Sequence, residues 1–169
     1  PVIITNCSNN YGPFQSPEKF IPKTIVSILE GQDICIYGDG KNARDSKHVD
    51  DHSRALLKVL SRGVIGSRYL IGQSQVQSNL DVAGKICDVF TSLDYQKYKH
   101  IKESITFVRD RPGHDYRYAV DGSHIAEELN WRSSIDFATG IKNTVDWYLE
   151  HPEWLMSSIT SGDTKKRKG

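Results

Sequence analysis

The segment RDRPGHDYRY, residues 109–118, places three arginines and one histidine around a Pro-Gly turn. Arg111 and His114 flank that turn, and Arg44 follows a second tight turn, formed by the GDG run at residues 38–40. A guanidinium group offers a planar fork of N–H donors that matches the oxygen atoms of a phosphate. Two interpretations stay open: these cations bind an anionic ligand, or they form structural ion pairs with nearby carboxylates. The candidate ion-pair partners are Asp39, Asp45, Asp110 and Asp115.

A second group of polar residues follows an apolar, β-branched run at the start of the chain. Asn9 and Asn10 are adjacent, and their amides both donate and accept hydrogen bonds, which suits contacts with ribose, sugar or amide groups. The alternative is a turn in which asparagines tolerate unusual backbone angles. Lys19 lies close to a predicted helix start, where a cation gains nothing from the helix dipole. An anionic ligand near Lys19 would explain its position.

Three further motifs match known chemistry but have simpler explanations. GDGKNA, residues 38–43, resembles a dinucleotide-binding loop, yet no convincing helix follows it and no acidic residue lies about 20 positions later. We interpret it as a turn. YQKYK, residues 95–99, fits the Y-x-x-x-K pattern of a dehydrogenase, but its lysine and tyrosine content predicts an exposed surface. HVDDH, residues 48–52, contains metal-ligand types, but helix capping by its aspartates explains half of the cluster.

Apolar periodicity and turn residues divide the chain into alternating strands and helices. Ser16 is expected to cap the first helix, Asp50 or Asp51 to start the second, and Ser78 to cap the third through a capping box with Asp81. Residues 8–13 are expected to form a turn. The predicted helices are 16–31, 50–63, 78–93, 121–131 and 134–150, and the predicted strands are 1–5, 33–37, 67–72, 104–108 and 116–120. This alternation predicts an α/β fold.

The composition indicates a folded protein without a strong overall charge. The 169 residues are 37% hydrophobic and 25% charged, with a net charge of +1, so no global field favours nucleic acid or a membrane surface. No apolar run is long enough to span a membrane, and the opening apolar stretch is too short for a signal peptide. Three cysteines without a C-x-x-C pair predict buried thiols in a reducing compartment, so we expect a cytoplasmic protein.

Four segments, in their order and spacing, resemble the dTDP-glucose 4,6-dehydratases, a family of extended short-chain dehydrogenase/reductases. They are CSNNYGPFQSPEKFIP, IYGDGKNARD, VDDHSRALL and FVRDRPGHDYRYAVD, and the later runs ELNW and TVDWYLEHPEW resemble the same family. The resemblance spans nearly the whole chain. It implies the last part of a Rossmann-type sheet, including residues 1–5, and a small α/β substrate-binding cap domain. It also implies NAD as cofactor, dTDP-glucose as substrate, and a place in deoxysugar and polysaccharide biosynthesis.

The resemblance implies roles for individual residues. Asn9 would contact the nucleotide sugar, and Asn10 would face the nicotinamide cofactor. Lys19 and Phe20 would line the sugar-nucleotide site, and Tyr37 would pack against the thymine. The diphosphate would be bound by two arginines with two polar residues beside them. These four residues are Arg44, Arg111, Asn79 and His114. The resemblance assigns no catalytic and no metal-binding residue to this chain.

Several parts of the family pattern are absent from this sequence. The Gly-rich NAD loop, the Thr-Asp-Glu run that supplies acid and base, and the catalytic Y-x-x-x-K pair all precede the SNN motif in the family. The family reaction oxidises the sugar at C4, eliminates water across C5 and C6, and returns the hydride to C6. Every group that moves a proton or hydride in that reaction is missing here. The chain also begins with Pro1, so we expect a fragment or processed product that is inactive in isolation.

Other positions depart from the family pattern. Ser46 to His48 replace an aromatic-rich run, Cys35 replaces a proline, Gln73 ends YLIGQ where the family has YNIGG, and Thr164 replaces a tyrosine. These changes keep two alternatives open. The chain is either a catalytically inactive, truncated binding module, or part of a dehydratase or epimerase for another nucleotide sugar.

The sequence also yields expectations about boundaries and partners. Residues 1–156 are expected to form the nucleotide-sugar-binding part, and residues 157–169, which end in KKRKG, a mobile polar tail. A strand that is apolar on both faces, such as residues 1–5, requires neighbours. We therefore expect a homo-oligomer, or pairing with a complementary amino-terminal half, and no nucleic-acid or membrane partner.

Overall fold

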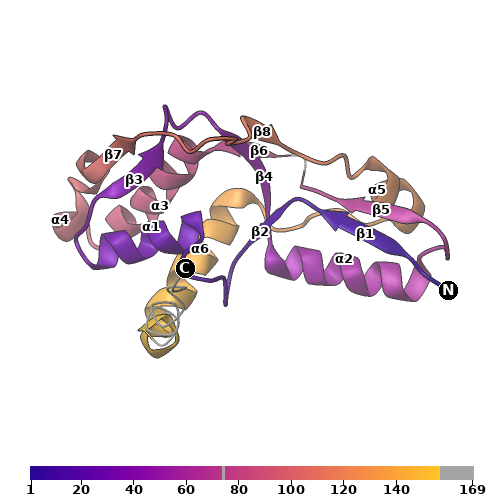
Figure 1. Cartoon of the computed structure of the whole chain (residues 1–169). Helices are drawn as coiled ribbons and strands as arrows, with labels where there is room; N and C mark the ends of the chain where they lie inside the picture. Colours follow the sequence, from indigo (N-terminus) through magenta and orange to yellow (C-terminus); the bar gives the residue numbers. More distant parts are fainter. Residues whose placement is uncertain (74, 157–169) are drawn as a thin grey trace, which may run out of the picture.

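The computed structural model describes residues 1–73 and 75–156, which form alternating short strands and helices (Figure 1). In chain order the elements are β1 (Ile4–Cys7), β2 (Asn9–Tyr11), α1 (Phe20–Leu29), β3 (Ile34–Tyr37), β4 (Ala43–His48), α2 (Val49–Arg62), β5 (Arg68–Ile71), β6 (Val76–Ser78), α3 (Asn79–Leu93), α4 (Tyr95–Tyr98), the 3₁₀ helix η1 (Ile101–Ser104), β7 (Ile105–Val108), β8 (Arg117–Tyr118), α5 (Ser123–Leu129) and α6 (Phe137–Glu150). The predicted α/β class is confirmed.

Two lobes are joined by the central strands β2, β4, β6 and β8 (Figure 1). The first, which we call the sheet lobe, contains β1, β5, α2 and α5. The second, the helical lobe, contains α1, β3, α3, α4, β7 and α6. Each lobe has a hydrophobic core of its own. Buried in the sheet lobe are Ala55, Val59, Tyr69, Ile71, Ile125, Leu129 and Trp131. The larger core of the helical lobe includes Ile25, Ile36, Ile86, Phe90, Ile141 and Tyr148.

The strands form three small, mostly parallel groups. Strand β1 pairs in parallel with β5, and β3 pairs in parallel with β7. Strand β4 is the centre of the third group, because it pairs in parallel with β2 and β8 and antiparallel with β6. The central position of β4 lets one strand connect the sheet lobe with the helical lobe.

The predicted helices are present, but two of them begin differently from expectation. Helix α1 begins at Phe20 with Lys19 as N-cap, because Ser16 accepts a turn hydrogen bond from the Lys19 N–H (3.0 Å) and lies outside the helix. Helix α2 is capped by His48, whose Nδ1 accepts from the Asp50 N–H at 3.3 Å. Neither predicted aspartate cap is therefore correct. The Ser78 cap of α3 is confirmed, with the Asp81 N–H donating to Oγ at 3.0 Å.

One expectation about strands was wrong. The predicted turn at residues 8–13 contains strand β2, since Asn9 pairs in register with Ser46 of β4 and gains backbone hydrogen bonds there. The opening strand was expected to require neighbours on both faces, and Val2 and Ile4 are exposed in this chain. Among the described residues β1 has β5 as its partner on one edge, and no strand covers the other.

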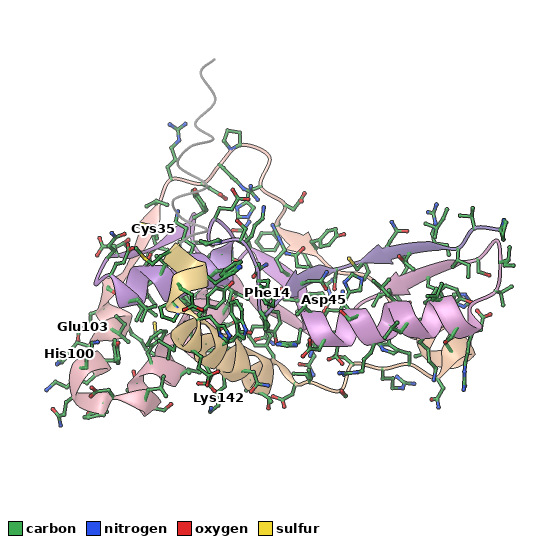
Figure 2. All side chains as sticks on the ribbon, turned by 90° about the horizontal axis from the view of Figure 1, so that it is seen from below. Phe14, Cys35, Asp45, His100, Glu103 and Lys142 are labelled. Atoms are coloured by element: carbon green, nitrogen blue, oxygen red, sulfur yellow. The ribbon has the colours of Figure 1, made fainter. Side chains whose placement is uncertain are left out.

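The cysteines and helices bear on two further expectations. All three cysteines are free thiols, but only Cys87 is buried, while Cys35 is exposed at the surface of β3 (Figure 2). The prediction of buried thiols is therefore right for one residue and wrong for another. No helix within the described ranges has both the length and the apolar character needed to cross a membrane. The predicted mobile tail, residues 157–169, lies outside the described residues.

Candidate nucleotide-binding pocket

A pocket of about 590 Å³ opens beside the central strands. All nine residues for which a binding role was expected from the sequence line it. They are Asn9, Asn10, Lys19, Phe20, Tyr37, Arg44, Asn79, Arg111 and His114. The fold therefore gathers into one cavity residues that are up to 105 positions apart (9 to 114) in the chain.

The starts of two helices contribute to the pocket. Lys19 is the N-cap of α1 and provides no side-chain cap, so the first N–H groups of that helix lack a side-chain partner. The Lys19 ammonium lies 3.0 Å from the carboxylate of Glu18, which also lines the pocket. Asn79 is the first residue of α3, and its N–H donates to the Asn42 carbonyl at 3.0 Å. Helix starts carry partial positive charge, so both favour an anion in the same cavity.

Strand alternation directs the pocket residues of β3 and β4. Cys35 and Tyr37 are exposed on one face of β3, whereas Ile34 and Ile36 are buried on the other. Alternation in β4 likewise brings Arg44 and Ser46, two residues apart, to the pocket. Cys35 therefore places a thiol in the wall of this cavity.

The turn between β3 and β4 is fixed by glycine and by helix α3. Gly38 and Gly40 have φ values of 61° and 75°, a region that favours glycine. A Cβ on Gly40 would lie 3.2 Å from the Cβ of Leu80, so the close approach to α3 also requires glycine. Strand β4 follows this turn, in agreement with the decision not to read GDGKNA as a dinucleotide loop.

The RDRPGHD segment forms a second turn at the pocket. The His114 Nδ1 lies 2.7 Å from Asp110 Oδ1, and this hydrogen bond is the main reason that the pKa of Asp110 is lowered. Gly113 has a φ of 69°, which closes the turn. The His114 ring lies edge-on to the Tyr37 ring, with 6.3 Å between their centroids. The carboxylate thereby orients the imidazole beside the aromatic wall of the pocket.

The two pocket arginines are not used in structural ion pairs. In residues 1–73 and 75–156 no carboxylate lies within ion-pairing distance of the Arg44 or Arg111 guanidinium. Asp39 pairs with Lys41 and Asp110 with His114, while buried Asp45 accepts from the Gln73 N–H. Neither arginine therefore forms a close ion pair, although the Arg111 charge contributes to the lowered pKa of Asp110. Arg44 Nη1 donates to the Ala43 carbonyl at 2.9 Å, and both arginines line the cavity.

Eight additional pocket residues were given no binding role by reasoning from sequence. They are Gln15, Glu18, Ile21, Lys23, Cys35, Ser46, Gln77 and Val82. Gln15 lies within the CSNNYGPFQSPEKFIP segment, but that segment did not single it out. Gln15 donates from Nε2 to the Asn10 carbonyl at 2.8 Å, and its buried Oε1 has no partner among the described residues. Alternation with Arg44 along β4 is the one signal that would have indicated Ser46.

The positions that depart from the family pattern have structural roles in the described chain. Lys47 is fully buried and donates to the Ile71 carbonyl at 2.7 Å, and His48 caps α2. Gln73 donates from Nε2 to the Ile135 carbonyl at 2.9 Å. Asp45, at the junction between α2 and the central strands (Figure 2), accepts from the Gln73 backbone. Lys47, His48 and Gln73 are therefore all hydrogen-bonded in this chain. Thr164 lies outside the described residues.

Neither of the other two motifs contributes a residue to the lining of the pocket, although His52 of HVDDH lies 2.9 Å from Asn10 Nδ2. Tyr95 is exposed in the short helix α4, which agrees with the surface interpretation of YQKYK. In HVDDH, Asp51 turns inward and accepts from the Ile135 N–H at 3.0 Å. Within the described ranges no group of three His, Cys, Asp or Glu side chains is arranged to hold a metal ion.

Comparisons with known proteins identify the class to which this fold and pocket belong. The sequence profile of the family described as GDP-mannose 4,6 dehydratase matches residues 1–144. The chain therefore belongs to the GDP-mannose 4,6 dehydratase family.

Within that class the chain is similar to dTDP-glucose 4,6-dehydratases, as the sequence resemblance indicated. The enzyme of that name from Shigella flexneri is 46% identical over 162 residues, which cover 96% of this chain and 44% of that protein. The one from Neisseria meningitidis serogroup B is 42% identical over 172 residues, covering 100% of this chain and 48% of that protein. The crystal structure of the Bacillus anthracis enzyme in complex with NAD matches with a TM-score of 0.84 and 39% sequence identity. The match covers 94% of this chain and 48% of that enzyme. The chain thus spans slightly less than half the length of these relatives.

Proposed function

We propose that this chain is the nucleotide-sugar-binding, carboxyl-terminal half of an NAD-dependent dTDP-glucose 4,6-dehydratase. Residues 1–156 form this binding part, and its substrate is dTDP-glucose. The enzyme converts that substrate to dTDP-4-keto-6-deoxyglucose and water when the half that carries the cofactor loop and the catalytic groups is present. The free thiols fit a reducing compartment, so we assign the enzyme to the cytoplasm.

One observation carries the proposal: two arginines without carboxylate partners face a pocket that also contains two helix starts. Arg44 and Arg111 bind the diphosphate through charge-assisted hydrogen bonds. The start of α1 adds positive potential, Lys19 lies beside it with its ammonium 3.0 Å from Glu18, and His114, hydrogen-bonded to Asp110, lines the same cavity. Tyr37 supplies an exposed aromatic face for a pyrimidine base.

The cofactor side of the pocket is represented in this chain by Asn10. Its Oδ1 is buried without a partner among the described residues, so it fits an N–H donor such as the carboxamide of NAD. NAD, when bound, supplies the hydride acceptor for the sugar. The residues of this chain bind and orient the substrate beside it.

The sheet lobe presents an apolar surface that we assign to the complementary amino-terminal half. Leu57, Leu60 and Ile65 are 65%, 82% and 68% exposed, and the free edge of β1 lies in the same lobe (Figure 1). Exposed apolar surface of this kind marks an interaction site, and a free parallel edge accepts another strand. In the absence of that half we expect the chain to self-associate. A monodisperse monomer in light scattering at micromolar concentration would count against this assignment.

Activity reconstitution tests the proposed function. This chain would be mixed with NAD and the amino-terminal half of a full-length relative, and the loss of dTDP-glucose would be followed by chromatography. We expect turnover in the mixture and none with either half alone. Turnover by the 169-residue chain with NAD alone would contradict the assignment of chemistry to the other half. Competition between dTDP and UDP would separate this function from that of an enzyme for another nucleotide sugar.

A further inference from the structure

A partly buried polar cluster surrounds the side-chain amide of Asn10. Asn10 Nδ2 is 2.9 Å from His52 Nδ1 and 3.6 Å from Cys7 Sγ. The cluster includes Lys47, whose side chain is fully buried and whose charge acts on His52. The cluster joins β1, β2, β4 and α2 at the carboxyl end of β1.

The hydrogen bonds of Lys47 are those of a charged ammonium. Its Nζ donates to the Ile71 carbonyl (2.7 Å), the Ser8 Oγ (3.0 Å) and the Ser8 carbonyl (3.3 Å). An ammonium has three N–H donors and no acceptor, so these three acceptors satisfy it completely. Burial lowers the pKa of Lys47, while Cys7, Asp45 and Asp51 act to raise it.

The protonation state of His52 decides which end of the Asn10 side-chain amide faces the pocket. A neutral imidazole that carries its proton on Nε2 accepts at Nδ1, and the Asn10 NH₂ group is the donor that lies beside it. Asn10 Oδ1 is then the end of the amide that stays buried without a partner among the described residues, and Asn10 is one of the residues that line the pocket. A protonated His52 would donate at Nδ1 instead, which favours an amide turned by 180° with its NH₂ toward the pocket.

We propose that His52 is a positioning residue that holds Asn10 with Oδ1 toward the pocket, and that the charge of Lys47 keeps His52 neutral for this role. The inference deepens the proposed function and rests on it for the ligand. Asn10 then accepts a hydrogen bond from an N–H or O–H group of the ligand and rejects a group that can only accept. The specificity of this corner of the pocket is set by a histidine that touches no ligand.

The surroundings of His52 favour its neutral form. Burial lowers the pKa of His52, and Lys47 lowers it further by charge repulsion. The elements packed against α2 carry other ionisable groups, and so does α2 itself. These groups are Arg44, Asp45, Lys47 and His48 of β4, Tyr11 of β2, Arg68 and Tyr69 of β5, His124, Glu127 and Glu128 of α5, Cys7 of β1, and Asp50, Asp51, Arg54, Lys58 and Arg62 of α2.

Nuclear magnetic resonance of the ¹⁵N-labelled chain tests the proposal without any activity measurement. His52 ring nitrogens and the Asn10 side-chain amide would be followed from pH 8 to pH 5. We expect an unprotonated Nδ1 at pH 8 and a change of the Asn10 amide signals at the same midpoint as His52 protonation. An Asn10 amide that is insensitive to the His52 titration would overturn the proposal.

Three variants make the test specific. His52→Gln retains an acceptor that does not titrate, so the Asn10 signals should lose their pH dependence while the amide stays ordered. Lys47→Met removes the buried charge and should move the His52 midpoint to higher pH. His100→Gln is the control, because His100 is exposed and pairs with Glu103. An unchanged His52 midpoint in a folded Lys47→Met chain would refute the role of Lys47.

A parallel titration with dTDP distinguishes this inference from the proposed function. If dTDP fails to bind while the Asn10 signals follow His52, the coupling of the two side chains stands and the proposed ligand is wrong. If dTDP binds and the Asn10 signals ignore His52, the proposed function stands and the positioning role is wrong.

Discussion

Replacement of Asp51 by asparagine should destabilise the junction between the two lobes. The Asp51 side chain is fully buried at the start of α2 and binds the segment that leads to α6. It accepts from Ser133 Oγ (2.5 Å), the Ser134 N–H (3.1 Å) and the Ile135 N–H (3.0 Å), and Arg54 also donates to it. This single carboxylate therefore ties the sheet lobe to the last helix of the helical lobe.

The expected loss follows from the number of donors that Asp51→Asn would leave unpaired. Each hydrogen bond to a charged group contributes about 1.5–3 kcal/mol. Asparagine keeps one acceptor oxygen but turns an NH₂ group toward the remaining donors. Loss of one or two such bonds predicts a decrease in the free energy of unfolding of about 1.5–6 kcal/mol. With a urea m-value of about 2 kcal/mol/M for a chain of this size, the midpoint should fall by roughly 0.8–3 M.

Urea unfolding at pH 7, followed by tryptophan fluorescence, measures this loss. Asp50→Asn is the matched control, since Asp50 is the preceding residue and its side chain is exposed; we expect less than about 1 kcal/mol there. A decrease below about 1 kcal/mol for Asp51→Asn, with an unchanged m-value, would refute the reasoning.

The pH dependence of the same variant provides an independent check. Burial acts to raise the pKa of Asp51, but hydrogen bonds from Ser133, Ile135 and Ser134, with the Arg54 charge, outweigh it, and the pKa lies below its usual value. The stabilisation by Asp51 is therefore complete above the unfolded pKa of about 4 and is lost as the pH falls through the lower folded pKa. The difference between wild type and Asp51→Asn should shrink only at acid pH.

Three further predictions concern packing, thiol chemistry and capping. Gly140→Ala should lower the free energy of unfolding by about 1–3 kcal/mol, because the added Cβ would overlap the Tyr11 hydroxyl. Gly84→Ala in α3, where the added Cβ meets open space, should raise the free energy of unfolding by up to about 1 kcal/mol in the same urea titration. The exposed Cys35 thiol should react quickly with a thiol reagent, and dTDP should protect it. Burial raises the pKa of Cys87 to about 11, so this thiol should react only when the chain unfolds. Equal reaction rates of the two thiols, measured by mass spectrometry, would contradict this prediction. Ser78→Ala should cost about 1 kcal/mol in thermal or urea unfolding by removing the cap of α3, and no measurable loss would show that the Ser78 cap does not stabilise the fold.

The sequence predicted elements well where local signals agreed. Helix α3 has an apolar stripe and a Ser78-Asp81 capping box, and both its bounds and its cap are as expected. Strand β2 was mistaken for a turn because Asn9 and Asn10 favour turns locally, whereas pairing with β4, more than 30 residues later, decides their conformation. Such pairing over long sequence separation leaves no local pattern.

The pocket was predicted from a resemblance rather than from physical patterns. Local reasoning left the Arg44 and Arg111 question open, because it gave no way to tell which carboxylates would be near them. The structure answers it by binding Asp45 to the Gln73 backbone and Asp110 to His114. The buried Lys47 was equally unpredictable, since its acceptors come from β5 and from the residue between β1 and β2.

Calorimetric titration of dTDP into the purified chain tests the central claim most directly. Wild type should bind, and Arg111→Ala should bind roughly 10- to 100-fold more weakly, the loss expected for charge-assisted hydrogen bonds to a phosphate. Arg109→Ala is the matched control, because Arg109 is exposed in the same segment and does not line the pocket. The Arg109→Ala variant should therefore bind dTDP with the affinity of the wild type. Absence of dTDP binding by the folded wild-type chain, or an equal loss in both variants, would contradict the claim that this half assembles the nucleotide-sugar site.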